Sequence, residues 1–295
     1  MLSAAGLLLL ALAPLLAGCS ALLAPRSDLV QTIAAAADHK QASAFDHGDL
    51  DSVLQRFVDS QGNVDYAALA ADDEPLERYY ARLALVSPDN HPEQFPDHDS
   101  RLAYWINAYN GAVLLSVMRA GDIASVSDVK VPWYLFYLPK NAGFFYYREL
   151  QFGGQAMSLY TLENSIVRAR FADPRVHFAL NCASAGCPRL PNAAFAAATL
   201  QAELDRETTR FFAESRNLMI DHGEKVIRLS QILNWHESDF TTWLTAQGTS
   251  SATLIDYVAR YAPPDLRIEL LGPAHDYRLE FVPYDWRLNA RDLKR

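Results

Sequence analysis

The sequence predicts an α+β fold, in which a single mostly helical body surrounds a small antiparallel or mixed sheet. Apolar residues recur at helical spacing in several segments of ten or more residues. Shorter extended segments flank turns that contain glycine, which is typical of hairpins. Half of the residues are hydrophobic, so a domain spanning residues 45–295 is large enough to bury a substantial core.

The first part of this domain is expected to be helical. Residues 50–59 place apolar side chains at helical intervals, and residues 76–86 form a second amphipathic pattern. A third helix is expected to start near Ser100, a residue type that caps helices, and to stop near Gly121. Because this segment is apolar almost all round, the pattern predicts a central buried helix.

The later part mixes helices with short strands. A hairpin turn is expected at Gly153 and Gly154, followed by a helix that starts at Ser158 and carries Glu163. Residues 176–182 are expected to form a strand that ends in a loop. The other expected elements are a long helix over residues 193–215, a hairpin over residues 217–230 that turns at His222 and Gly223, helical segments over residues 231–240 and 251–262, and a C-terminal strand and turn over residues 277–289.

The N-terminus indicates export. Residues 1–18 are apolar and small, and a segment this short is typical of a signal peptide rather than a membrane span. The letters LLAG before Cys19 resemble a bacterial lipoprotein signal, which implies cleavage there and lipid on Cys19. Ser20 then implies the outer membrane. A plain signal peptide is the alternative, and the absence of Lys or Arg before the leucine run departs from the export pattern.

We therefore expect a signal peptide over residues 1–18, a lipidated tether over residues 19–44 and one domain over residues 45–295. The protein is expected to face the periplasm and to contact the membrane through the lipid on Cys19. The net charge of −9 and the lack of a basic stripe argue against nucleic acid as a partner. An unknown periplasmic ligand or protein remains as the expected partner.

Five stretches together resemble one family. They are AYWINAYN, SLYTLENSIVR, DPRVHFALNCASAGCPRL, LSQILNWHESDF and YDWRLN. Their order and spacing are similar to those of the domain of unknown function 547 family, over roughly Ser100 to Asn289. This resemblance implies a shared fold but no established reaction. The family commonly carries a histidine after the glutamate of the second stretch, whereas Asn164 follows Glu163 here.

The stretch HFALNCASAGCPRL leaves three chemistries open. In a thiol enzyme, Cys182 or Cys187 would be the nucleophile and His177 the base. Asn181 or Glu163 would then orient the imidazole. Such a site would act as a hydrolase or acyltransferase on amide or ester bonds, and it needs donors for an oxyanion, for which Asn107 and Asn110 are candidates. The composition resembles that of papain- or transglutaminase-type sites, which carry the cysteine at the start of a helix. The central helix of this sequence carries AYW instead.

The second possibility is a disulfide between Cys182 and Cys187. An even pair in an oxidising compartment favours it, and the small residues between them allow the loop to close. The third possibility is zinc bound by these cysteines and His177, but their spacing matches no familiar ligand pattern. We therefore expect no metal and no cofactor.

Binding is the other function class that the sequence leaves open, and we expect it over catalysis. The aromatic stretches VPWYLFY and FFYY would recognise a periplasmic ligand or partner beside a disulfide-pinned loop. A pocket is expected where the strand over residues 176–182 meets the central helix. The candidate binding residues are Trp105, Asn107, Asn110, Arg189, Trp235 and Asp239, the last of which would alternatively cap a helix or pair with Arg168 or Arg175.

Overall fold

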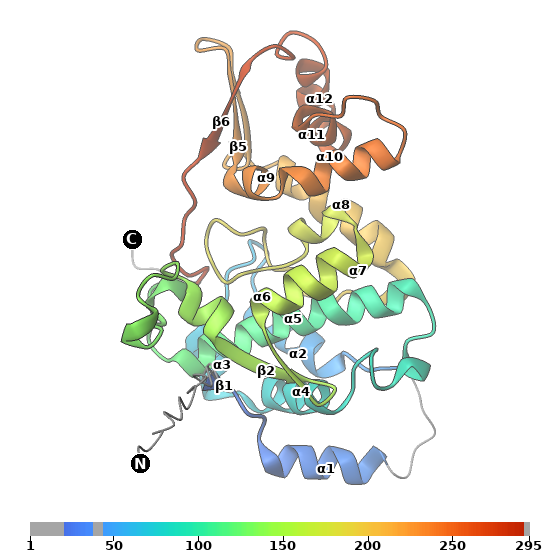
Figure 1. Cartoon of the computed structure of the whole chain (residues 1–295), viewed down its shortest axis with the longest axis vertical. Helices are drawn as coiled ribbons and strands as arrows, with labels where there is room; N and C mark the ends of the chain where they lie inside the picture. Colours follow the sequence, from blue (N-terminus) through green and yellow to red (C-terminus); the bar gives the residue numbers. More distant parts are fainter. Residues whose placement is uncertain (1–20, 38–43, 292–295) are drawn as a thin grey trace, which may run out of the picture.

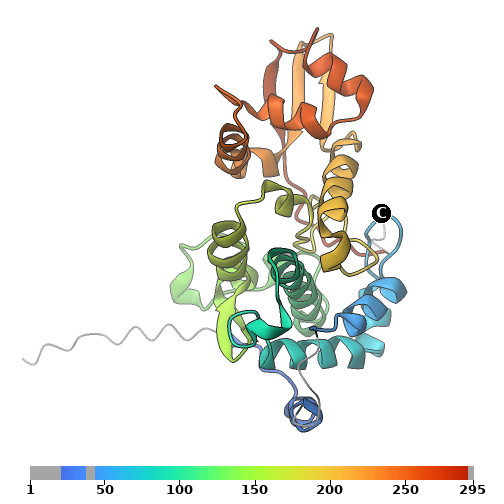
Figure 2. The same cartoon turned by 90° about the vertical axis from the view of Figure 1, so that its right-hand side faces the viewer.

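The computed structural model describes residues 21–37 and 44–291. They form two lobes that follow one another along the long axis of the molecule (Figure 1), and each lobe has a hydrophobic core of its own. Helix α8 (Leu200–Phe212) runs between the lobes (Figure 2), because Leu204 packs in the first core and Phe212 in the second. The α+β fold class is confirmed, although two small sheets replace the single sheet that was expected.

The first lobe is built around helix α5, and most of its helices and turns come before residue 148. These elements are α1 (Ser27–Ala37), α2 (Gly48–Phe57), α3 (Tyr66–Ala71), α4 (Glu74–Leu85), η1 (Pro92–Gln94), α5 (His98–Ala120), η2 (Val126–Asp128), η3 (Trp133–Leu135) and η4 (Gly143–Tyr147).

Helix α5 is the central buried helix that the sequence predicts. Every residue from 102 to 117 is buried, so this helix contributes to the core on all its faces. Its N-cap is Asp97 rather than Ser100: the Asp97 carboxylate accepts from the Ser100 backbone, and the Ser100 hydroxyl accepts from the Asp97 backbone. The N-cap therefore lies three residues earlier than expected, and Gly121, whose φ of 78° suits glycine, caps the other end of the helix.

The sheet of the first lobe has the order β1-β2-β3, with β1 parallel and β3 antiparallel to β2. Its strands are β1 (Ala21–Leu22), β2 (Arg148–Phe152) and β3 (Gln155–Ser158). Gly153 and Gly154 both have positive φ at the predicted hairpin turn. Ser158 then caps a continuous helical rod made of α6 (Leu159–Thr161), the π-helical η5 (Leu162–Arg168) and α7 (Ala169–Phe171).

The second lobe holds the other sheet, of order β4-β5-β6, and four helices. The predicted hairpin is present as an antiparallel pair, and the C-terminal strand pairs in parallel with its second strand. The elements are β4 (Leu218–Asp221), β5 (Val226–Ser230), α9 (Gln231–Trp235), α10 (Glu237–Ala246), α11 (Leu254–Tyr261), α12 (Pro264–Leu270) and β6 (Arg278–Val282).

The predicted strand over residues 176–182 is wrong. The chain forms a 3-10 helix, η6 (Pro174–Phe178), which Asp173 caps, and continues irregularly. A strand would place Val176 and Phe178 on one face, but Val176 packs in the first core and Phe178 in the second. In place of a neighbouring strand, the side chain of Asn110 binds the backbone of this segment.

The long helix expected over residues 193–215 is shorter in the structure. Helix α8 starts at Leu200, after a single 3-10 turn, η7 (Ala197–Thr199). The preceding residues are held by side chains of the first lobe, since the Ala194 backbone donates to Asp51 and Phe195 binds Asn107. Within residues 21–37 and 44–291, no helix combines the length and the apolar character that a membrane span needs. Cys19 lies outside the described residues.

Candidate functional site

A cavity of about 230 Å³ lies where the helical rod, η6, the loop after it and the second lobe meet. Residues of α5, of the rod and of the C-terminal segment line it together. This place is close to the pocket that the sequence predicts, beside the central helix. The lining residues are Tyr109, Asn141, Phe145, Tyr146, Tyr160, Glu163, Asn164, His177, Leu180, Cys182, Cys187, Pro188, Ile232, Trp235, His236, Tyr284 and Trp286.

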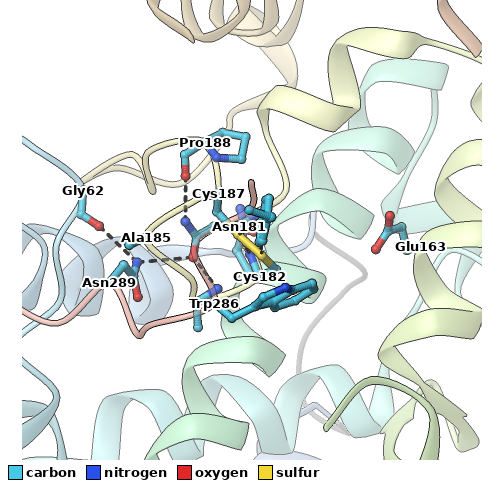
Figure 3. The surroundings of a disulfide bond; sticks show 12 residues. Gly62, Glu163, Asn181, Cys182, Ala185, Cys187, Pro188, Trp286 and Asn289 are labelled. Atoms are coloured by element: carbon cyan, nitrogen blue, oxygen red, sulfur yellow. Dashed lines mark hydrogen bonds between the residues drawn. A yellow bond between two sulfur atoms is a disulfide. The ribbon is translucent and has the colours of Figure 1, made fainter. Parts of the chain in front are cut away.

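Cys182 and Cys187 form a disulfide at the edge of this cavity (Figure 3), with their Cα atoms 6.1 Å apart. The Tyr284 hydroxyl lies 3.0 Å from Sγ of Cys182 and 3.1 Å from Sγ of Cys187. Of the three chemistries left open, the structure therefore contains the disulfide. In this state neither sulfur is a free nucleophile or a zinc ligand.

The buried asparagines fix the loop rather than face the cavity. Asn181 donates from Nδ2 to the Pro188 carbonyl (Figure 3). It accepts at Oδ1 from the Ala183 backbone. Asn110 and Asn107 act in the same way, since each binds both a backbone N–H and a backbone carbonyl. The structure thus gives these amides a structural role in place of the expected contacts with an oxyanion or a ligand.

The His177 ring is held by Asp239, which is itself bound by Arg168. Its Nε2 donates to Oδ2 of Asp239 over 2.8 Å, and Arg168 binds the same carboxylate at 2.7 and 2.9 Å. Partial burial acts to raise the pKa of Asp239, but the hydrogen bonds from His177 and Arg168 outweigh it and keep that pKa well below its usual value. Asp239 is therefore a carboxylate that orients the His177 ring, the role that the sequence assigned to Asn181 or Glu163.

Glu163 projects from the π-helical η5 toward the disulfide (Figure 3). The hydroxyl of Tyr109 on α5 donates to its Oε2 over 3.2 Å. Burial in the cavity raises the pKa of Glu163, although His177 and Arg168 act in the opposite direction. Segments of π-helix are frequent at functional sites, because they rotate a side chain out of the regular helical position.

His236 completes the polar part of the cavity. Its ring stacks on that of His177, with centroids 4.0 Å apart and planes at 20°. Its Nδ1 is buried and has no hydrogen-bond partner among the described residues. Burial lowers the pKa of His236 to about 2, so this ring is neutral at physiological pH. One ligand atom each of Glu163, His177 and His236 lies within 4.8 Å of the others, which is close enough to consider a metal.

Two groups of rings line the rest of the cavity. Tyr146 and Tyr160 stack with centroids 4.2 Å apart, and Tyr284 contacts both Trp235 and Trp286 with centroids 4.9 and 4.6 Å apart. Of the two predicted aromatic stretches, FFYY therefore contributes Phe145 and Tyr146 to the cavity. The rings of VPWYLFY are outside its lining and are instead exposed on η3 and the turn after it.

The other predicted binding residues have separate roles. Trp105 is 1 % exposed and packs in the first core. Arg189 pairs with Glu214 and lines a neighbouring groove rather than this cavity. Trp235 lines the cavity, as expected of a binding residue, and Asp239 acts through His177.

His236, Tyr109 and Tyr284 line the cavity but were not predicted as site residues. A signal existed for His236, because its spacing of three residues from Asp239 places both on one side of a helical turn. Asn164, where the family commonly has a histidine, lines the same cavity as His236. The chain thus supplies an imidazole to this cavity from the second lobe.

A scan against protein families matches residues 92–212 to the family described as "Protein of unknown function, DUF547". The chain therefore contains a DUF547 domain over these residues, which include α5, the rod, η6, the disulfide and α8. Glu163 and His177 lie inside the matched region, whereas His236, Asp239 and Tyr284 lie outside it. Neither the curated proteins nor the solved structures contain a match to the chain.

Proposed function

We propose that this protein is an exported, lipid-anchored binding module that takes a small ring-containing ligand with a polar head into the cavity between its lobes. The cavity lining has two parts, stacked rings and a cluster of polar groups, and this division carries the proposal. Stacked rings offer flat apolar surface to a sugar or an aromatic ring. Glu163, His177 and His236 gather at one place, where they would bind the polar head of the ligand.

The disulfide supports binding in an oxidising compartment. It closes the loop that borders the cavity, and Tyr284 lies against both sulfurs. A rim fixed in this way loses little conformational entropy when a ligand binds, which favours affinity. Disulfides of this kind persist mainly in exported proteins, so the same feature supports a periplasmic location.

The proposed anchor is lipid on Cys19 in the outer membrane, with the domain facing the periplasm. Cys19 precedes Ala21 by two residues, and Ala21 begins β1, which pairs with β2. A lipid on Cys19 would therefore hold the first lobe close to the membrane surface, because two extended residues span at most about 7 Å. Loss of membrane association in a Cys19→Ser variant would test this anchor.

The binding proposal is tested on the mature chain carrying Cys19→Ser, exported and purified without reductant. Saturation-transfer NMR with a panel of monosaccharides and small aromatic acids reports which fragments bind. We expect Trp235→Ala to weaken binding at least about tenfold, since stacked rings dominate such sites. Trp133→Ala is the matched control, because Trp133 is exposed outside the cavity lining. If no fragment binds, or if both variants bind as the wild type does, the proposal fails.

A hydrolase or acyltransferase for amide or ester bonds is the second candidate, which the His177–Asp239 pair favours. A carboxylate that orients an imidazole is one part of such sites, and a nucleophile is the other. The sulfurs would supply the nucleophile after reduction. This candidate predicts hydrolysis of p-nitrophenyl acetate that appears with reductant and disappears in Cys187→Ala. Equal rates with and without reductant would argue against it.

A further inference from the structure

Three side chains with metal-binding chemistry converge in the cavity from three separate elements. Glu163 comes from η5, His177 from η6, and His236 from the junction of α9 and α10. Their ligand atoms lie within 4.8 Å of one another. One point therefore lies no more than about 2.8 Å from all three, so zinc bonds of about 2.0–2.2 Å need shifts of less than about 1 Å. Because the His177 and His236 rings stack with their planes at 20°, at least one ring must also rotate to aim its nitrogen at a shared ion.

The hydrogen bonds around these residues match those that surround bound metal ions. His177 uses Nε2 to bind Asp239, which leaves Nδ1 as the ring nitrogen available to a cation. Arg168 in turn fixes Asp239 with two hydrogen bonds. A metal-binding histidine almost always donates its other N–H to a carboxylate or a carbonyl in this way.

His236 and Glu163 each have an atom to which the described residues offer no hydrogen bond. Nδ1 of His236 is buried, and the described residues offer it no hydrogen bond. A buried nitrogen without a partner is costly, and coordination to a cation would satisfy its lone pair. Among the described residues, the Glu163 carboxylate receives one hydrogen bond, from Tyr109 to Oε2, so Oε1 remains for coordination.

We propose that Glu163, His177 and His236 bind one divalent transition-metal ion, with Zn²⁺ as the favoured occupant. Two imidazoles and one carboxylate suit Zn²⁺, Co²⁺ or Fe²⁺ better than Mg²⁺ or Ca²⁺, which prefer oxygen ligands. Three protein ligands leave a fourth position open toward the cavity. This site goes beyond the proposed binding function, because it needs no organic ligand, although the open position would accept the polar head of one.

The test uses the mature Cys19→Ser chain without an affinity tag, stripped with a chelator and titrated with ZnCl₂ by calorimetry. We expect one ion per chain in the wild type. Glu163→Gln and His236→Gln should each lower the affinity at least about 100-fold, and Asp239→Asn about 10- to 100-fold through its effect on His177. His275→Gln is the control, since the His275 side chain is exposed and binds Asp276 alone among the described residues.

If a variant fails to fold, binding of Co²⁺ to the wild-type protein tests the proposal instead. Bound Co²⁺ in the wild type should show the visible absorption of a nitrogen- and oxygen-ligated ion, and Zn²⁺ should displace it. Sulfur-to-cobalt charge transfer would overturn the proposal, because it would place the ion on the cysteines. A folded wild type that binds no ion, or equal affinity in Glu163→Gln and His275→Gln, would also overturn it. Fragment binding by the stripped protein would leave the proposed binding function intact in those cases.

A second, independent observation concerns the exposed rings of residues 133–137. Trp133 and Phe136 are 84 % and 82 % exposed, and Tyr134 and Tyr137 lie beside them. Exposed Lys130 and Lys140 flank this patch in the sequence. Large exposed apolar patches mark interaction sites, and aromatic rings with nearby lysines are typical of the membrane interface.

The position of this patch selects a membrane as its partner. The segment that carries it leads into η4 and then β2, the strand that pairs with β1. The segment over residues 130–140 and β1 lie on the same side of the first lobe (Figure 1), so a lipid on Cys19 would bring this side toward the bilayer. We infer, resting on the proposed lipid anchor, that Trp133 and Phe136 insert into the interface of that membrane.

Vesicle sedimentation tests this inference with the full mature chain. The Cys19→Ser chain is mixed with vesicles of phosphatidylethanolamine and phosphatidylglycerol, and we expect weak binding that Trp133→Ala with Phe136→Ala abolishes. The control is Ile268→Ala, an apolar residue on α12 of the second lobe that is 69 % exposed. Binding that is the same in all three proteins, or self-association that the double variant removes without vesicles, would overturn the inference. A loss of membrane association that is seen only in cells would instead test the proposed lipid on Cys19.

Discussion

His177 and Asp239 form a hydrogen bond of 2.8 Å although 62 positions separate them in the chain. Asp239 belongs to α10 in the second lobe, and the same carboxylate binds Arg168 on the rod of the first lobe. This carboxylate therefore links the lobes at the cavity and also orients an imidazole that faces it. Stability and the shape of the site depend on the same contact.

Replacing Asp239 with Asn should destabilise the protein at neutral pH. The variant keeps the shape of the side chain but leaves Arg168 without its bidentate partner, and loss of one member of a partly buried pair costs about 2 kcal/mol. Urea unfolding at pH 7 measures this difference. Asp276→Asn should have no effect, since the Asp276 side chain is 99 % exposed. An equal loss in both variants would show that the contact does not stabilise the lobes.

His47 should make stability depend on pH. Burial lowers its pKa to about 4 in the folded protein, whereas the unfolded value is about 6.5. The unfolded chain therefore takes up a proton between these values and the folded protein does not, so stability falls by about 3 kcal/mol as the pH drops from 6.5 to 4. Above pH 6.5 this contribution is fully present and constant.

His47→Asn isolates this effect, because an amide oxygen replaces Nδ1 as acceptor for the Tyr79 hydroxyl, which lies 2.8 Å away. Unfolding curves for both proteins between pH 4 and pH 7 give the comparison. We expect the wild type to lose more stability than the variant toward pH 4. Parallel curves would mean that His47 is protonated in the folded protein.

The elements that were predicted correctly depend on local signals. The apolar run of α5, the glycines at 153 and 154 and the turn at His222 act within a few residues of the element that they specify. The strand predicted over residues 176–182 failed because Val176 and Phe178, which would share one face of a strand, pack in two separate cores, and a local pattern does not show which core a side chain enters.

For the candidate site, the sequence likewise predicted residues from local motifs but not the contacts between them. Glu163, His177, Trp235 and the cysteine pair were found because each belongs to a short motif with recognisable chemistry. The contacts between them come from distant segments, since Tyr284 reaches Cys182 over 102 positions. The tertiary arrangement of the lobes determines such contacts, so the sequence offered the residue types without their partners.

The disulfide should leave no free thiol in the mature Cys19→Ser chain. Alkylation followed by intact mass measurement of the exported, unreduced protein should add no label, and reduction should expose two sites. Cys182→Ser with Cys187→Ser should lower the free energy of unfolding by about 2 kcal/mol, as expected for closure of a short loop. Two labelled thiols before reduction would instead direct attention to thiol catalysis with His177.

Asn110→Ala should destabilise both the protein and the rim of its cavity. The Asn110 amide is 3 % exposed and binds the Ala179 carbonyl and the Asn181 N–H at 3.0 and 2.9 Å. Its removal leaves two buried backbone groups unpaired, at a cost of about 2–4 kcal/mol in urea unfolding. The same backbone leads directly into the disulfide, so fragment binding should weaken as well. Asn234→Ala on the exposed side of α9 is the control and should match the wild type. Unchanged stability in Asn110→Ala would show that water or relaxation replaces the amide, and the loop would then owe its position to the disulfide alone.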